Sequence, residues 1–182
     1  MKADRRLFLL VPVALAALVG GVALELKQRP AEIVPPAVLA QLRDLPLQTL
    51  DGKPFTLVSL SGKTVVVNFW ATWCAPCKEE MPDLVRLQTE LAPRSVQFVG
   101  IGIDSADNMR AFAQKLAINY PLVFGTGATV SLVRALGNQI GALPYTIILN
   151  PTGSATFAKI GRILPEEIRD AVAAAAITPV AK

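Results

Sequence analysis

Residues 64–77 read TVVVNFWATWCAPC, and this stretch holds both cysteines and both tryptophans of the 182-residue chain. Its first part, Thr64–Ala71, is a continuous β-branched and aromatic run, which is typical of a strand buried on both faces. Cys74 and Cys77 follow at once, and apolar residues at helical spacing continue to about Ala92. The stretch therefore predicts a C-x-x-C motif between a buried strand and the start of a helix.

That placement gives the two thiols a redox mechanism. A helix N-terminus presents free N–H groups and a partial positive charge, which stabilise a thiolate on Cys74. Pro76 fits the first helical turn, where its missing N–H costs no hydrogen bond. Because two residues separate the thiols, Cys77 can attack a mixed disulfide formed by Cys74. We therefore predict that Cys74 is the nucleophile and Cys77 the resolving thiol.

Other uses of two cysteines fit the sequence less well. A closed zinc site needs four ligands, usually Cys or His, and the chain has two cysteines and no histidine. A c-type haem needs a histidine directly after the second cysteine, where this chain has Lys78. A purely structural disulfide would close a loop of two residues, for which the entropic gain is small. We expect neither a metal nor a cofactor.

The rest of the chain alternates predicted strands with predicted helices. An Asp51-Gly52 turn between short apolar runs indicates an N-terminal β-hairpin. Further strands are predicted at Val96–Asp104, Tyr145–Asn150 and Ala155–Gly161, and further helices at Ser105–Ile118, Thr129–Gly137 and Pro165–Ala176. The alternation favours an α/β fold with a largely parallel central sheet, finished by an antiparallel pair formed by the last two strands.

The N-terminal segment is predicted to enter or cross a membrane. Leu7–Leu24 is 18 residues without a charge, enough to span a bilayer as a helix, and basic residues precede it. The run exceeds the length of a usual signal-peptide core, which favours an uncleaved anchor, although Gly21–Ala23 is a passable cleavage site. The predicted organisation is an anchor or signal at 1–26, a linker rich in proline and charge at 27–46, a domain at 47–176 and a tail at 177–182. Within the linker, a short helix is predicted at Ala37–Arg43.

The charge of the chain gives no support to a nucleic-acid partner. The net charge is +4, but residues 1–30 hold five basic and two acidic residues, which leaves +1 for all the rest. Nucleic-acid binding needs a clustered basic face on the folded domain. The basic character therefore belongs mainly to the segment that flanks the predicted membrane span.

Residues 65–82, VVVNFWATWCAPCKEEMP, resemble the membrane-anchored TlpA- and ResA-like thiol-disulfide oxidoreductases of bacteria, within the thioredoxin-fold superfamily. The resemblance covers roughly Leu47 to Ala176. It implies a thioredoxin-like fold, with a central mixed β-sheet flanked by helices, facing the periplasm or the cell exterior. It also implies reduction of protein disulfides, often in cytochrome c maturation or oxidase assembly, with electrons from a membrane thiol transporter.

The resemblance extends to the substrate face. Pro144, in GALPYT, matches the cis-proline of thioredoxin-fold proteins, whose loop packs beside the cysteines. Backbone groups of Leu143 would then bind an extended substrate by strand addition. Tyr145 stands where relatives usually have threonine, which would alter the substrate face. Trp73 and Pro76 complete the expected substrate contacts, whereas Trp70 is assigned to the core.

Glu80 matches an acidic residue close to the active site of ResA-like proteins. A half-buried carboxylate near two thiols could have a raised pKa and relay protons. The alternative is a solvated acid in the first turns of a helix, where a negative charge is favoured anyway. Thioredoxins proper have an aspartate where this chain has Asn68, which cannot take a proton, so that task would fall to Glu80, water or the substrate.

The leading prediction is an exported, anchored disulfide reductase. A disulfide-forming oxidant is the first alternative, but such proteins often have histidine between the cysteines, and Ala-Pro supplies no cation. A peroxidase of the peroxiredoxin type would resemble P-x-x-x-T-x-x-C, whereas Ala71 stands three residues before Cys74. A copper carrier could hold Cu(I) on two thiolates, but Met81 is the one methionine near the pair and its helical spacing indicates core.

Overall fold

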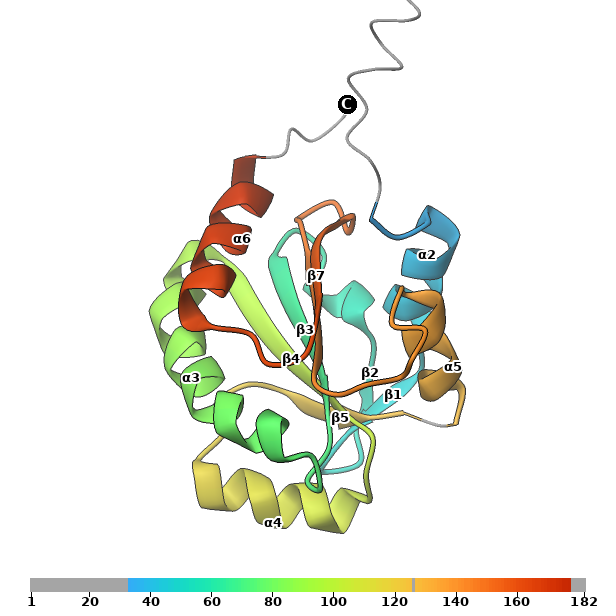
Figure 1. The fold of residues 1–182 in the computed structure, drawn as a ribbon, viewed down its shortest axis with the longest axis vertical. Helices are drawn as coiled ribbons and strands as arrows, with labels where there is room; N and C mark the ends of the chain where they lie inside the picture. Colours follow the sequence, from blue (N-terminus) through green and yellow to red (C-terminus); the bar gives the residue numbers. More distant parts are fainter. Residues whose placement is uncertain (1–32, 126, 178–182) are drawn as a thin grey trace, which may run out of the picture. The chain divides into compact units, whose positions relative to one another are not determined.

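The computed structural model describes residues 33–125 and 127–177 of the chain (Figure 1). The segment predicted to be an anchor or signal, residues 1–26, lies outside the described residues. So do residues 27–32 of the predicted linker and 178–182 of the predicted tail. Within the described ranges, every helix falls short of the length and apolarity that crossing a membrane requires.

A seven-stranded mixed sheet forms the centre of the domain, in the order β2-β1-β5-β4-β3-β6-β7. The strands are β1 Leu47–Thr49, β2 Pro54–Phe55, β3 Thr64–Trp70, β4 Val96–Gly102, β5 Leu122–Phe124, β6 Tyr145–Leu149 and β7 Ala155–Ile160. β4 runs parallel to both β3 and β5, and the other pairings are antiparallel. The sheet is therefore mixed rather than largely parallel, and its last two strands are the antiparallel pair expected from the sequence.

β3 is buried along its whole length, because helices cover both faces of the sheet (Figure 1). All seven of its side chains are buried, as its unbroken β-branched and aromatic run predicts. It is also bonded on both edges: Val67 pairs with Val99 on β4 and with Ile147 on β6. The segment that follows β3 therefore starts from a strand that is held in place on both faces and both edges.

The helices form two layers (Figure 1). They are α2 Pro36–Asp44, α3 Ala75–Leu91, α4 Ala106–Leu116, α5 Ala128–Ala135 and α6 Pro165–Ile177, with 3-10 turns η1 at Leu57–Leu60 and η2 at Ala92–Arg94. α3, α4 and α6 contribute to the core on one face, with Met81 and Ile168 packed against Val66. α2 and α5 contribute to the other, with Leu39 and Leu132 among the residues that pack with Val67.

Most predicted elements are present, and their ends agree within two residues. β5 was not predicted, because a strand of three residues is too short to show a periodic pattern. It nevertheless joins β4 to β1 and so brings β1 and β2 into the sheet. β1 and β2 pair antiparallel across a turn in which Gly52 has a φ of +85°, a conformation that glycine adopts without strain.

The predicted linker at 27–46 is corrected by the structure, since the packed domain begins at Ile33. Leu39 and Leu42 of α2 are buried in the core, and so are Val34 before the helix and Leu45 after it. The prolines and charges of this segment made it look like a tether. The short helix predicted at Ala37–Arg43 is present as α2, but its apolar residues face the core, and it starts with Pro36 in the first turn, where proline is well tolerated.

Replacing Leu42 by alanine tests whether α2 is part of the domain. Leu42 is fully buried, so Leu42→Ala should lower the free energy of unfolding by about 2–5 kcal/mol. Gln41→Ala, on the exposed side of the same helix, should change it by less than about 0.5 kcal/mol. Urea unfolding of the oxidised protein measures both, and equal effects would show that α2 is not packed as described.

Candidate active site

The two cysteines lie where β3 gives way to α3. Cys74 is the N-cap residue of α3, and its sulfur accepts a hydrogen bond from the N–H of Cys77 at 3.3 Å. The two residues form a disulfide. Cys74 is 5% exposed and Cys77 is fully buried, so an incoming sulfur can reach Cys74 and not Cys77. This difference agrees with the order of attack that the sequence predicts, because the accessible sulfur must be the one that meets the substrate.

The loop before β6 lies at the same end of the sheet. The Leu143–Pro144 peptide bond is cis, as the resemblance to thioredoxin-fold proteins implies. Because β6 runs antiparallel to β3, its first residue pairs with Phe69 near the end of β3. Leu143 packs against the core cluster that contains both cysteines, and the carbonyl of Pro144 accepts a hydrogen bond from Gly161 at 2.8 Å. The structure thus brings the proline loop and the cysteine pair together.

The two tryptophans are divided as the sequence suggests. Trp70 is fully buried and its ring lies 5.3 Å from the ring of Phe112. Trp73, directly before the accessible cysteine, is 68% exposed, and Pro76 in the first turn of α3 is exposed as well. Trp73 and Pro76 therefore offer apolar surface next to Cys74.

Tyr145 does not take the place on the substrate face that was expected for it. Its side chain is 2% exposed, its ring stacks on Phe69, and its hydroxyl donates a hydrogen bond to the carbonyl of Leu136 at 2.6 Å. Residues that pair directly across two strands project from the same face, so Tyr145 follows Phe69 into the core covered by α2 and α5. Its position after Pro144 could not show which face it takes.

Glu80 lies one turn beyond Cys77 on α3 and is completely buried. Its Oε1 accepts a hydrogen bond from Nδ2 of Asn68 at 2.8 Å, and its Oε2 accepts one from the N–H of Ile163 at 2.9 Å. Asn68 also donates to Oγ1 of Thr146 at 3.0 Å. This burial rules out a solvated acid at position 80. That description suits Glu79 instead, which is 61% exposed and pairs with Arg162.

Burial raises the pKa of Glu80 from its usual 4.5 to about 7. The hydrogen bonds from Ile163 and Asn68 and the positive charges of Arg162 and Lys159 act in the opposite direction and offset only part of the rise. A carboxyl group that titrates near neutral pH can both hold and release a proton under ordinary conditions. The arrangement therefore provides an acid-base group beside the resolving cysteine.

Three of the groups around Glu80 could not be assigned to the site from the sequence. Ile163 contributes through its backbone N–H, for which no side-chain pattern gives a signal. Thr146 lies two residues after Pro144, and this closeness in sequence is the one indication that it belongs to the site. Lys159 is one of several charged residues near the C-terminus, and only the register of β7 brings it to this part of the sheet.

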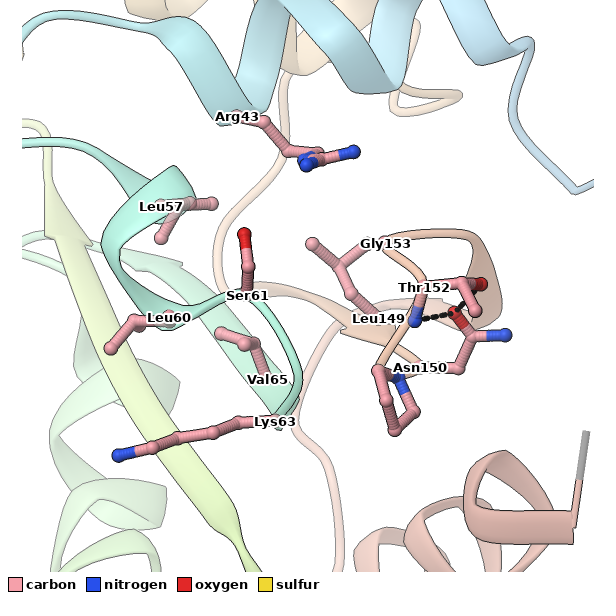
Figure 2. Close-up of a pocket in the computed structure, with 11 residues that line it drawn as sticks. Arg43, Leu57, Leu60, Ser61, Lys63, Val65, Leu149, Asn150, Thr152 and Gly153 are labelled. Atoms are coloured by element: carbon pink, nitrogen blue, oxygen red, sulfur yellow. Dashed lines mark hydrogen bonds between the residues drawn. The ribbon is translucent and has the colours of Figure 1, made fainter. Parts of the chain in front are cut away.

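No group of three or more metal-ligating side chains is found among residues 33–125 and 127–177. A shallow pocket lies at the other end of the sheet, lined in part by Arg43, Ser61 and the β6–β7 turn (Figure 2). Leu149, which also lines it, pairs with Val65 near the start of β3 and so lies far from the cysteines. The side chain of Lys63 points away from Arg43 in this view. The pocket therefore does not gather the two cations around one ligand.

Comparisons with known proteins agree with this geometry. Residues 38–157 match the AhpC/TSA family. The chain is 32% identical to thioredoxin-like protein YneN of Bacillus subtilis, over 70% of this chain and 74% of that protein. It is 30% identical to thiol-disulfide oxidoreductase ResA of the same organism, over 68% of each. A solved thiol:disulfide interchange protein of the thioredoxin family from Chlorobium tepidum superposes with a TM-score of 0.65 at 31% identity, covering 72% of this chain and 94% of that one.

The raised pKa of Glu80 predicts how the stability of the oxidised protein depends on pH. Between about pH 4.5 and pH 7 the folded protein keeps a proton on Glu80 that the unfolded chain has lost, so stability falls as the pH rises through this window. The full loss should be on the order of 3 kcal/mol. In Glu80→Gln this loss should be absent, so the difference in unfolding free energy between the two proteins should change with pH.

Urea unfolding at a series of pH values from about 4 to 8 measures that difference. Glutamine suits the site because Oδ1 of Asn68 has no hydrogen-bond partner among the described residues and can accept from the new amide. Glu79→Gln, at the exposed neighbouring position, is the matched control and should leave the pH dependence unchanged. A parallel pH dependence in the wild-type and Glu80→Gln proteins would mean that Glu80 titrates at its ordinary pKa.

Proposed function

Since the chain belongs to the AhpC/TSA family and is a ResA-like thiol-disulfide oxidoreductase, we propose that it works as an exported protein-disulfide reductase. The observation that carries the proposal is the cysteine pair itself. Cys74, the more accessible of the two cysteines, caps α3 beside the Pro144 loop, while Cys77 is buried in the core. This is the geometry that a dithiol needs in order to pass two electrons to a bound disulfide.

Reduction takes two steps. The thiolate of Cys74 attacks one sulfur of the substrate disulfide, which forms a mixed disulfide and releases the first substrate thiolate. Cys77 then attacks the sulfur of Cys74, releases the second substrate thiolate and leaves the Cys74–Cys77 disulfide. Glu80 accepts the proton that Cys77 loses in this second step, which a carboxylate with a pKa near 7 can do at neutral pH.

The substrate would lie across Trp73, Pro76 and the proline loop. Trp73 and Pro76 supply exposed apolar surface beside Cys74. Leu143 would bind an extended substrate segment through its backbone, as an added strand does. Tyr145 has no part in this contact because its side chain is buried.

Three features favour the reductive direction and a redox role over the alternatives. The residues between the cysteines, Ala75 and Pro76, supply no positive charge to stabilise the dithiol as strong oxidants require. Met81 is fully buried among the apolar side chains of the core, a packing role that needs no copper ion. Ala71 offers no hydroxyl three residues before Cys74, so the peroxidase arrangement is also unsupported.

The setting of the reaction follows from the sequence and the resemblance. Residues 1–26 would anchor the domain to the outer face of the cytoplasmic membrane, or be cleaved to release it into the periplasm. The partners would then be protein disulfides and a membrane thiol donor that restores the dithiol. Cytochrome c maturation and oxidase assembly are the processes in which relatives with this motif often act.

The direction can be tested by the redox state of the cysteine pair in growing cells. Acid quenching followed by thiol alkylation should find Cys74 and Cys77 mostly as the dithiol, because a reductase in an oxidising compartment must be kept reduced by its donor. Samples treated with reductant and with oxidant before quenching define the two limits of the gel shift. A pair that is mostly disulfide would contradict the reductive direction.

The order of attack can be tested by trapping. Cys77→Ser should accumulate mixed disulfides between Cys74 and its substrates, since no second thiol is left to resolve them. Cys74→Ser is the matched control and should trap none, because Cys77 is fully buried. Non-reducing gels followed by mass spectrometry identify the adducts. Comparable adducts in both variants would overturn the assignment of Cys74 as nucleophile.

A further inference from the structure

A positively charged residue stands in the same row of the sheet as the asparagine that binds Glu80. Asn68 on β3 pairs with Thr146 on β6, which in turn pairs with Lys159 on β7. Residues directly opposite one another project from the same face, and neighbouring strands are about 4.8 Å apart. The face is the one on which α3 and α6 lie side by side (Figure 1). Lys159 is therefore two strands from Asn68, on the side where Glu80 is buried.

Lys159 is held there by Glu167. Its Nζ lies 2.6 Å from both carboxylate oxygens of Glu167, and the two side chains are 29% and 33% exposed. Glu167 is the third residue of α6, and its Oε2 also accepts the N–H of Leu164 at 2.8 Å. A glutamate at this position commonly reaches back in this way to the residue that caps its helix.

The backbone between β7 and α6 connects this ion pair to Glu80. The N–H of Ile163 binds Glu80, and the next N–H, that of Leu164, binds Glu167. Consecutive residues of the chain are 3.80 Å apart at Cα, so the two carboxylates lie within about 10 Å of each other. The carboxylate of Glu167 is therefore a negative charge close to Glu80, and it is paired with the ammonium group of Lys159.

Few other charges face Glu80. Arg162, in the loop between β7 and α6, pairs with Glu79 of α3 at 3.4 Å, and these side chains are 44% and 61% exposed, so water screens them more. Lys78 is exposed at the start of α3. β3 and β6 contribute the neutral Asn68 and Thr146, and the segment before β5 contributes the hydroxyl of Tyr120, which stays protonated at neutral pH. The least exposed ion pair around the site is Lys159–Glu167.

We propose that Lys159 and Glu167 are positioning residues whose opposite charges together set the proton affinity of Glu80. Lys159 favours the ionised carboxylate of Glu80, and Glu167 favours the protonated form, so in the intact pair Glu167 offsets part of the effect of Lys159. Removing either partner alone leaves the other unbalanced. The functional value of this balance rests on the proposed proton transfer between Cys77 and Glu80.

Two substitutions should therefore move the pKa of Glu80 in opposite directions. Lys159→Met keeps the length of the side chain and leaves Glu167 unpaired, which should raise the pKa by about half a unit or more. Glu167→Gln keeps an oxygen for the N–H of Leu164 and leaves Lys159 unpaired, which should lower it by a similar amount. The double variant should return close to the wild-type value.

The measurement is a titration of the Glu80 carboxyl carbon by NMR, in the detergent-solubilised, oxidised full chain labelled at glutamate. Glu80→Gln identifies the resonance by its loss. If the ion pair merely packed the loop over Glu80, both substitutions would let water in and would lower the pKa toward 4.5. A fall in Lys159→Met, or no shift in either variant, would overturn the proposal.

A matched control comes from a different ion pair of α6, which joins this helix to α3. Arg169 binds Glu90 through two hydrogen bonds of 2.7 and 2.8 Å, almost three turns of α3 beyond Glu80. Arg169→Gln should leave the pKa of Glu80 unchanged. Because the titration needs no substrate and no donor, its failure would leave the reductase proposal intact. Conversely, finding Cys74 and Cys77 mostly as a disulfide in cells would contradict the reductive direction but would leave the titration result for Glu80 unchanged.

Discussion

The burial of β3 on both faces is the constraint on which the site depends. A strand enclosed by two helical layers has to bring the chain to the surface between Trp70 and Ala75, where α3 begins. Cys74 falls at that point, and its sulfur takes up one of the N–H groups that a helix start leaves unpaired. β6 runs antiparallel to β3 and so must begin where β3 ends, which delivers Pro144 to the same place. The reactive sulfur is thus located by backbone geometry.

The second feature of the site is the buried carboxyl group of Glu80, and the groups around it offset only part of the effect of its burial on its pKa. Donors reach Glu80 from β3 and from the β7–α6 loop, yet burial still outweighs them. Asn68 contributes as a donor here, whereas an aspartate at the same position would place two carboxyl groups in contact. The exchange of aspartate for asparagine therefore fits a site in which the acid has moved from the strand to the helix.

The sequence predicts the fold well because its signals are local and strong. The β3 run, the C-x-x-C motif and the helix starts at Ser105 and Pro165 each depend on a few neighbouring residues. β5 and the packing of α2 were missed or misjudged because three residues show no period and because prolines concealed an apolar face. At the site, Cys74, Cys77 and Pro144 were located correctly. The direction of Tyr145 and the donors to Glu80 depend on register and on distant backbone, which no local pattern records.

The bond between Glu80 and Ile163 joins positions that are 83 residues apart in the chain. During synthesis, which starts at the N-terminus, the cysteine motif and Glu80 are therefore made long before Ile163, whose N–H binds Glu80. Until β7 and the first turn of α6 arrive, Glu80 remains open to water and should behave as an ordinary surface acid. The complete redox centre is thus a late product of folding, and a chain shortened before α6 would keep both cysteines yet lack the environment that tunes them.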